Sequence, residues 1–451
     1  NTSGSGLSAT DAGVNTIFGG DIAISSIGFG WHVKGVGIYA EGTGSGNSIT
    51  TENGNVAILG DSNGNLFGYG MDAKDSGTNS VTTENGNVTV SGIGQIARGM
   101  TASSGHNSIT TKSGEVTVSG NGNQPYPPLR GYGMYADTSG SNSIITESGK
   151  IIISGNGSPE GHGMYAADFG SNSIATQSGN VTVSGSHYGM AVGGSGINRI
   201  DTESGSVTIS MSDNGMGAIS SGVNSIATKS GYVAISASDN GMYANTSGSN
   251  SIFSESGSIM VSSIAAFAYG IHAEDFGSQN SISTESGDVT VSAISNGGVN
   301  AFGMSAEYSG KNSITTANGQ VTVTGNGADN GYGMYAYYAG SNNSIETNSG
   351  NVTVSGSSDN SGGYGIGMYT RESGSNSILT ESGNVTVSGI GNNNESYGIG
   401  MYTKDSGSAS IFAANGNVTV SGESAAYGYG MHAKFSGSNS ITATGNGQMT
   451  V

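Results

Sequence analysis

A short unit, Asn-Ser-Ile-x-Thr-x-Ser-Gly-x-Val-Thr-Val-Ser-Gly, recurs from one end of the chain to the other. Successive units are 26 to 35 residues apart, which is not the behaviour of a helical repeat of fixed length. Because no single unit can bury its own apolar side chains, a chain of this kind must stack similar units on one another. The first aliphatic residue marks the phase of each unit, at Ile17, Ile49, Val81, Ile109, Ile144, Ile174, Ile200, Ile226, Ile252, Ile282, Ile314, Ile345, Ile378, Ile411 and Ile441.

The variation in length is confined to one of the three connections in each repeat. Seven residues separate the marker from the first Val of Val-Thr-Val in nearly every repeat, and nine to eleven separate the Met of Gly-Met-Tyr-Ala from the next marker. The stretch from Val-Thr-Val to the next Met varies from 9 to 18 residues and holds all four prolines, Pro125, Pro127, Pro128 and Pro159. Since proline cannot donate a ladder hydrogen bond, this connection is predicted to be a surface loop.

Each repeat contains three short segments with period-two alternation: Met-x-Ala, Ile-x-Thr and Val-x-Val. Such short, β-branched segments between Gly, Asn and Ser are typical of strands, not helices. We expect each strand to pair in parallel with its equivalent in the next coil, about 4.8 Å away. The sequence therefore predicts an all-β parallel β-solenoid of about fifteen coils with three short strands per coil, filling residues 1–451 as a single elongated domain without a separate globular domain.

Stacking places equivalent positions in columns, and three columns are predicted to be structural. The Met column, for example Met71 and Met134, admits only apolar substitutes and is predicted to face inward. The Gly five residues after the marker, such as Gly149, is predicted to supply a positive φ at a corner. The Asn two residues before the marker, such as Asn172, is predicted to form an internal ladder of side-chain amides.

Composition limits the partners of the chain. It contains 31 acidic and 12 basic residues, a formal net charge of −19, which argues against binding nucleic acid or an anionic membrane surface. No apolar run approaches the roughly 18 residues that a transmembrane helix requires, and the absence of cysteine leaves the redox compartment undecided. The chain starts at Asn1 without a signal segment, so we expect a processed product or an excerpt of a longer protein.

A column of acidic residues follows the marker by three positions, at Glu52, Glu84, Glu147, Glu203, Glu255, Glu285 and Glu381. Stacked carboxylates suit calcium, and a close pair suits glycosidic acid and base chemistry. Lys112 and Lys229 interrupt the column, however, which favours a charge-balanced outer face. The six histidines do not converge, and no catalytic residue and no metal or cofactor ligand is predicted, although calcium uptake is left open.

The variable loops are expected to carry any recognition, because insertions there leave the core unchanged. In the longest loop, residues 119–131, Tyr126 and Arg130 offer an aromatic face and a guanidinium to a sugar or a protein, or else cover an edge of the core. The outward Thr of Val-Thr-Val forms rows that resemble the ice-facing surface of some solenoid antifreeze proteins, although Thr is also an ordinary exposed strand residue.

The tandem Gly-Tyr-Gly-Met-Tyr-Ala and Asn-Ser-Ile-x-Thr-x-Ser-Gly-Asn-Val-Thr-Val-Ser-Gly units resemble the passenger regions of bacterial autotransporter and haemagglutinin-type adhesins along the whole chain. The resemblance implies a right-handed parallel β-helix, in agreement with the right-handed preference of parallel crossovers. It implies a stalk or passenger exported to the bacterial cell surface or outside the cell, and we expect it to have no enzymatic activity. Its expected partner is a glycan or protein on a host or neighbouring cell.

Two other classes of function stay open. The chain starts on a Met-type strand at Leu7 and ends on a Val-Thr-Val-type strand, which predicts either omitted neighbouring sequence or head-to-tail stacking of subunits into a filament. An enzyme that acts on polysaccharides needs Asp, Arg and Lys clustered over adjacent coils. Twelve basic residues in 451 disfavour it.

Overall fold

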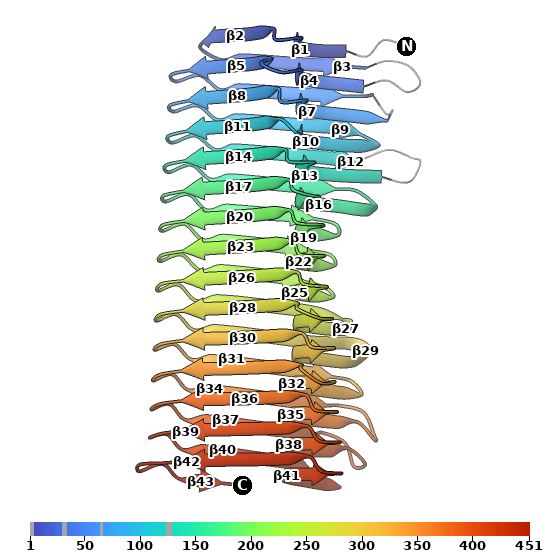
Figure 1. Cartoon of the computed structure of the whole chain (residues 1–451), viewed down its shortest axis with the longest axis vertical. Coiled ribbons are helices and arrows are strands. Elements are labelled where there is room, and N and C mark those ends of the chain that lie inside the picture. The colour runs from blue at the N-terminus through green and yellow to red at the C-terminus, as the bar shows by residue number, and fades with distance from the viewer. Residues whose placement is uncertain (1–3, 29–33, 64–65, 123–128) are drawn as a thin grey trace. The chain divides into compact units, whose positions relative to one another are not determined.

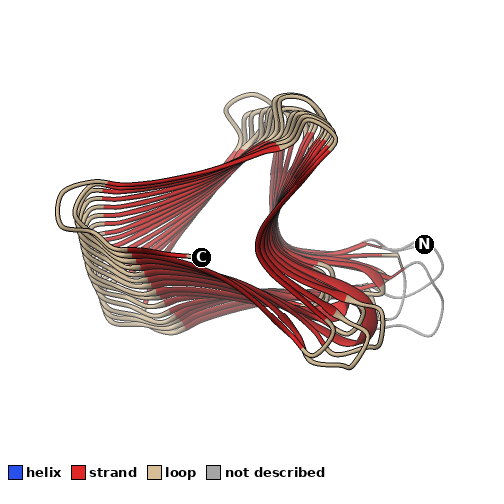
Figure 2. Ribbon diagram, turned by 90° about the horizontal axis from the view of Figure 1, so that it is seen from below, coloured by secondary structure: helices blue, strands red, loops and turns tan. Residues whose placement is uncertain are grey.

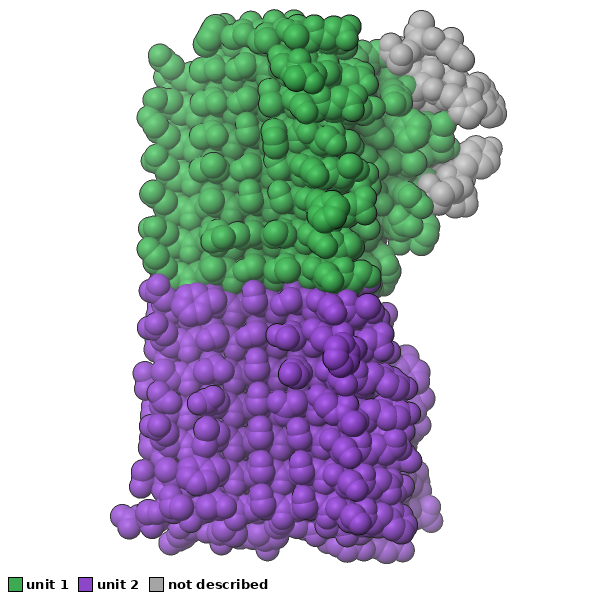
Figure 3. All heavy atoms as spheres, in the orientation of Figure 1, with its two compact units in different colours: residues 1–213, 220–231 green, residues 214–219, 232–451 purple. Residues whose placement is uncertain are grey.

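The computed structural model describes residues 4–28, 34–63, 66–122 and 129–451. Strands joined by turns and loops make up this part of the chain, and it contains no helix. Two compact units are present, unit 1 (Asn1–Asp213 and Ser220–Gly231) and unit 2 (Asn214–Ile219 and Tyr232–Val451), coloured separately in Figure 3. Within each unit every strand pairs in parallel with its equivalent one coil away (Figure 1). Each unit is therefore a parallel β-solenoid, as predicted, while the single elongated domain stays a prediction.

Unit 1 repeats three kinds of strand, which we name after their marker residues. Its Met strands are β1 (Gly4–Thr10), β4 (Lys34–Glu41), β7 (Phe67–Lys74), β10 (Ile96–Ser103), β13 (Leu129–Asp137), β16 (Pro159–Ala166) and β19 (Tyr188–Val192). Its Ile strands are β2 (Val14–Gly19), β5 (Gly46–Thr51), β8 (Thr78–Thr83), β11 (His106–Thr111), β14 (Ser141–Thr146), β17 (Ser171–Thr176), β20 (Ile197–Thr202) and β23 (Val223–Thr228). Its Val strands are β3 (Ile22–Ile27), β6 (Val56–Asp61), β9 (Val88–Gly94), β12 (Val116–Gly122), β15 (Ile151–Asn156), β18 (Val181–Gly185) and β21 (Val207–Met211).

Unit 2 has the same three kinds of strand, with one variation. Its Met strands are β22 (Asn214–Ile219), β25 (Asn240–Asn245), β32 (Asn330–Tyr337), β35 (Tyr364–Arg371), β38 (Tyr397–Lys404) and β41 (Tyr427–Lys434). Its Ile strands are β26 (Ser249–Ser254), β28 (Gln279–Thr284), β30 (Lys311–Thr316), β33 (Asn342–Thr347), β36 (Ser375–Thr380), β39 (Ser408–Ala413) and β42 (Ser438–Ala443). Its Val strands are β24 (Val233–Ala237), β31 (Val321–Gly327), β34 (Val352–Ser358), β37 (Val385–Gly391), β40 (Val418–Ser424) and β43 (Met449–Thr450). In β27 (Ile259–Glu274) and β29 (Val289–Glu307) the Val and Met strands of one coil merge into a single strand.

The core of each unit is built from the predicted inward columns. Met71, Met100 and Met134 of unit 1 are fully buried, as are Met304 and Met334 of unit 2. Each pairs in register with the equivalent residue of the next coil, so that a large side chain lies over a large one. The inward orientation of the Met column is therefore confirmed.

The predicted asparagine ladder is also present, and it is buried. In unit 1, Asn142 Nδ2 donates to Asn172 Oδ1 at 2.8 Å, and Asn172 Nδ2 donates to Asn198 Oδ1 at 2.8 Å. Asn172 Nδ2 also donates to the backbone oxygen of Tyr165 at 2.8 Å. Each side-chain amide thus ties its Ile strand both to the next coil and to the Met strand of its own coil.

The ladder is interrupted in unit 2, where Ala409 lies in register between Asn376 and Asn439. Asn439 Oδ1 is consequently buried without a hydrogen-bond partner. We expect Ala409→Asn to raise the free energy of unfolding by roughly 1–2 kcal/mol, because it supplies the missing donor. Chemical denaturation measures the effect, and an unchanged or lower midpoint would contradict it.

The glycine after each Ile strand does not have the role that we predicted. Gly86, Gly114 and Gly149 are not among the residues with positive φ. The reason for glycine is instead close approach between coils: a Cβ on Gly149 would lie 1.8 Å from the carbonyl oxygen of Gly114, and a Cβ on Gly114 would lie 1.8 Å from that of Gly86. These glycines let successive backbones lie in contact at this corner.

Positive φ occurs instead at the corner between the Met strand and the Ile strand. Two successive non-glycine residues adopt it, for example Thr138 (φ 46) with Ser139 (φ 67) and Asp75 (φ 47) with Ser76 (φ 70). The left-handed conformation is uncommon for residues with a side chain and costs free energy, so these turns are strained.

A second ladder, which sequence reasoning missed, lies on the surface just before the Val strands. The backbone N–H of Asn384 donates to Asn351 Oδ1 and that of Asn417 donates to Asn384 Oδ1, both at 2.9 Å. In unit 1 the Glu115 N–H donates to Asn87 Oδ1 at 2.8 Å. The Asn-Val-Thr sequences therefore have a structural use in joining adjacent coils.

Candidate functional site

The Met strands carry two rows of side chains outside the core that contact each other. Tyr132 and Tyr135 both leave β13 on its outer side, and their ring centroids are 5.0 Å apart. Between them Gly133 leaves no room for a side chain, since a Cβ would lie 2.7 Å from the carbonyl oxygen of Gly163. The end-on view in Figure 2 shows strands that bend within the coils. These outer rows are largely sheltered from solvent, and His272, which belongs to one of them, is 8 % exposed.

Rings within a row stack on one another along the solenoid. Tyr269, Phe302 and Tyr332 of unit 2 have successive centroid distances of 4.8 and 5.1 Å and interplanar angles of 9° and 7°. Because each ring covers the face of its neighbour, these residues stabilise the stack and do not offer their faces to a ligand.

Of the two residues predicted to bind a ligand, Tyr126 lies outside the described residues. Arg130 lies in strand β13, in register with Ile96 and Glu160, and not in a loop. Its Nε is 3.0 Å from Glu160 Oε2, which also accepts a hydrogen bond from the Tyr132 hydroxyl at 3.0 Å. The guanidinium is therefore already engaged with a carboxylate, and its binding to a ligand stays a prediction.

Other carboxylates beside the outer rows are likewise accompanied by a base. Asp405 Oδ2 lies 3.3 Å from Arg371 Nε. Asp72 Oδ2 lies 3.8 Å from Lys74 Nζ, and burial raises the pKa of Asp72 to about 6. Each of these two carboxylates therefore has a cation nearby, whereas Glu41 and Asp137, at the ends of β4 and β13, accept hydrogen bonds from Tyr39 and Tyr135 instead.

In the part of unit 2 that the structure describes, two carboxylates without a lysine or arginine partner lie next to each other. Glu274 and Glu307 end the adjacent strands β27 and β29, directly after the register partners Ala273 and Ala306. In the described part of the chain, neither forms an ion pair with a lysine or arginine. Since equivalent residues of neighbouring parallel strands are about 4.8 Å apart, two like charges stand together here.

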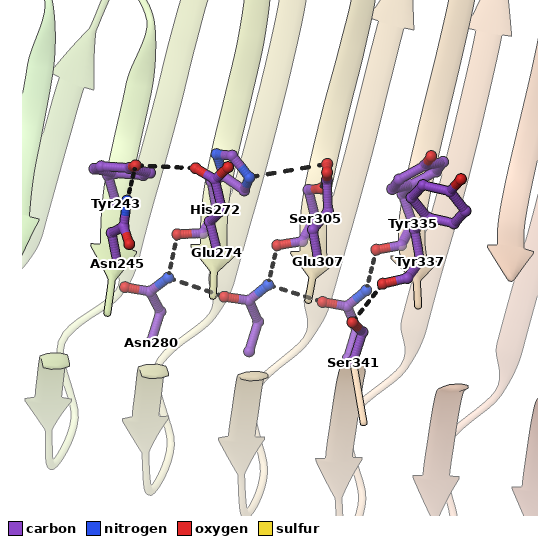
Figure 4. Close-up of polar contacts among 12 residues, drawn as sticks. Tyr243, Asn245, His272, Glu274, Asn280, Ser305, Glu307, Tyr335, Tyr337 and Ser341 are labelled. Atoms are coloured by element: carbon purple, nitrogen blue, oxygen red, sulfur yellow. Dashed lines mark hydrogen bonds and ion pairs between the residues drawn. The ribbon is translucent and has the colours of Figure 1, made fainter. Parts of the chain in front are cut away.

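The hydrogen bonds around these carboxylates hold them in place (Figure 4). The Tyr243 hydroxyl donates to Glu274 Oε2 at 3.0 Å, and the Ser305 hydroxyl donates to Glu307 Oε1 at 3.1 Å. His272 Nε2 faces Glu307 Oε1 at 3.9 Å, is buried, and has no hydrogen-bond partner. The site therefore contains a buried polar nitrogen without a hydrogen bond beside a carboxylate.

Burial determines the charges in this site. It raises the pKa of Glu307; the hydrogen bond from Ser305 opposes the shift and the charge of Glu274 adds to it. Burial lowers the pKa of His272 to about 4, so the imidazole is neutral near pH 7 and does not compensate the carboxylates.

Exposed aromatic residues stand at the corners next to these carboxylates. Phe276 is 80 % exposed and Tyr308 is 46 % exposed. Tyr308 (φ 47) and Tyr338 (φ 69) have left-handed backbones, and their rings stack with centroids 4.3 Å apart. Hydrogen bonding to Tyr338 raises the pKa of Tyr308, and the charges of Glu307 and Glu274 contribute. We call Glu274, Phe276, Glu307, Tyr308 and Tyr338 the corner patch; sequence reasoning missed it.

The predicted acidic column after the Ile strands is charge-balanced in the coils that carry a lysine. Lys112 Nζ lies 2.8 Å from Glu84 Oε1, and Lys229 Nζ lies 3.3 Å from Glu203 Oε1. No three His, Asp or Glu side chains gather to hold a metal ion in the residues described. Calcium uptake stays a prediction.

Comparisons of the sequence with models of known protein families and with curated proteins found no match. The class to which the chain is assigned, that of parallel β-solenoid proteins, therefore rests on the fold. Within the described residues no helix is long and apolar enough to span a membrane.

Proposed function

We propose that the chain is a non-catalytic attachment scaffold that acts outside the bacterial cell and binds a surface glycan through the corner patch. The observation that carries the proposal is the placement of exposed aromatic rings at strained corners, beside two carboxylates with no lysine or arginine partner within the described residues. Left-handed backbone recurs at other corners, for example at Thr138 and Ser139, so the exposed rings beside two adjacent carboxylates are what distinguish this corner. Aromatic rings with nearby polar groups are the usual components of a sugar-binding surface.

The fold supports this function physically. Each corner is fixed by parallel pairing on both sides, since β27 pairs with β25 and β29, and β29 pairs with β27 and β32. The rings of the patch are thus presented from a rigid frame, which reduces the entropy lost on binding. The adhesin resemblance of the repeats agrees with an attachment role.

An array of neutral, acidic and amino-sugar oligosaccharides tests the proposal. We expect the purified chain to bind at least one class, and Phe276→Ala or Tyr308→Ser to weaken that binding at least about tenfold, since exposed aromatic anchors dominate such contacts. Phe169→Ala is the matched control. Phe169 is 71 % exposed and also lies between Asp and Gly, but Ala167 stands where Glu274 stands in the patch.

The proposal would be overturned if the chain bound no glycan on the array. It would also be overturned if Phe276→Ala and Phe169→Ala weakened glycan binding equally. Release of new reducing ends from a bound glycan would contradict the non-catalytic part. Unchanged far-UV circular dichroism of each variant confirms that the solenoid is intact.

A further inference from the structure

The corner patch brings two partly buried carboxylates onto adjacent strands with no lysine or arginine beside them in the described residues. Glu160, Asp405 and Asp72 each have a basic side chain within 4.0 Å. Glu274 and Glu307 stand on adjacent strands without a lysine or arginine in the described residues. Two neighbouring carboxylates repel each other, and partial burial strengthens that repulsion. A cationic group placed between them would relieve it.

A second and independent observation points to a ligand at the same place. His272 Nε2 is buried without a hydrogen-bond partner, and it faces Glu307 at 3.9 Å. A buried polar atom without a partner costs about 1–3 kcal/mol, so native structures rarely leave one unexplained. A polar group bound beside Glu307 would provide the missing hydrogen bond (Figure 4).

We propose that the corner patch binds the ammonium group of an amino sugar between Glu274 and Glu307. The proposal rests on the glycan-binding function above and names its substrate class. The exposed rings of Phe276 and Tyr308 contact the sugar and the cation, since aromatic rings attract both apolar C–H groups and ammonium groups. His272 forms a hydrogen bond with a second polar group of the bound amino sugar.

The test compares two oligosaccharides of equal length, a glucosamine hexamer and its fully N-acetylated counterpart, at mildly acidic pH where the free amines are protonated. Isothermal titration calorimetry with the full chain is expected to show at least about tenfold tighter binding of the glucosamine hexamer. Glu274→Gln and Glu307→Gln, which keep size and shape, are each expected to abolish most of that preference.

The chain carries a net charge of −19, so a matched charge control is required. Glu147→Gln removes the same charge from an exposed position of unit 1 and is expected to leave the preference unchanged. Equal losses for all three Gln variants would overturn the proposal and indicate general attraction of a polycation. If both hexamers bind equally well and Tyr308→Ser abolishes the binding of both, the amino-sugar inference is overturned. The proposal that the corner patch binds a glycan would still stand.

Discussion

Replacing Gly149 by alanine is expected to lower the free energy of unfolding of unit 1 by about 3 kcal/mol, at the upper end of the cost of overpacking. The new Cβ would lie 1.8 Å from the carbonyl oxygen of Gly114. That oxygen belongs to the backbone of the adjacent coil, so it cannot turn aside as a flexible side chain does. Relief requires the two coils to separate at a corner where parallel pairing begins. Denaturant unfolding followed by circular dichroism measures the loss.

Gly19→Ala is the matched control for this prediction. Gly19 ends an Ile strand of the same unit, and a Cβ there meets no atom within 4 Å. We expect its effect to stay within about 0.5 kcal/mol, as for most surface substitutions. Equal effects of the two substitutions would show that close approach of coils is not the reason for glycine at Gly149.

Replacing Asn172 by alanine is expected to destabilise unit 1 by at least about 3 kcal/mol, because each buried group that loses its partner costs about 1–3 kcal/mol. Three groups lose a hydrogen bond: Asn142 Nδ2, which keeps its bond to the Tyr135 carbonyl oxygen, Asn198 Oδ1, and the carbonyl oxygen of Tyr165. Asn172 is fully buried, so water does not replace the lost bonds without entering the core. The midpoint of chemical denaturation reports the change.

Ser173→Ala serves as the comparison on the same strand. Its hydroxyl is half-buried and donates to Ser143 Oγ at 3.3 Å, so we expect a change within about 0.5 kcal/mol. If Asn172→Ala is no more destabilising than Ser173→Ala, the ladder adds little to stability. The gain expected for Ala409→Asn would then also be absent.

The repeat predicted the fold because equal residues recur at equal phase. The recurrence of Met at one position and of Asn at another predicted two inward-facing columns. The structure contains both as buried stacks. The role of Gly149 was not predictable in the same way. A recurring glycine indicates either positive φ or close approach, and the sequence of one coil does not show which atom of the next coil lies nearby.

The corner patch was missed because its residues break the repeat. In most coils the first corner residue with a left-handed backbone is Asp, Ser or Thr. In the coil of the patch that residue is the aromatic Tyr308, and it directly follows the acidic Glu307. A search for departures from the column consensus would have found them. Sequence reasoning placed recognition in the longest loop instead, yet Arg130 there lies on a strand and pairs with Glu160.

The central claim is that residues about thirty positions apart are neighbours in register, and a disulfide test in this cysteine-free chain examines it directly. Ser143 and Ser173 are register partners with hydroxyl oxygens 3.3 Å apart. The double variant Ser143→Cys with Ser173→Cys is predicted to form an intramolecular disulfide on mild oxidation. Ser143→Cys with Ala175→Cys, a diagonal pair roughly 8 Å apart and beyond disulfide reach, is predicted not to. Cross-linking of the diagonal pair in preference to the register pair would contradict the stacked solenoid.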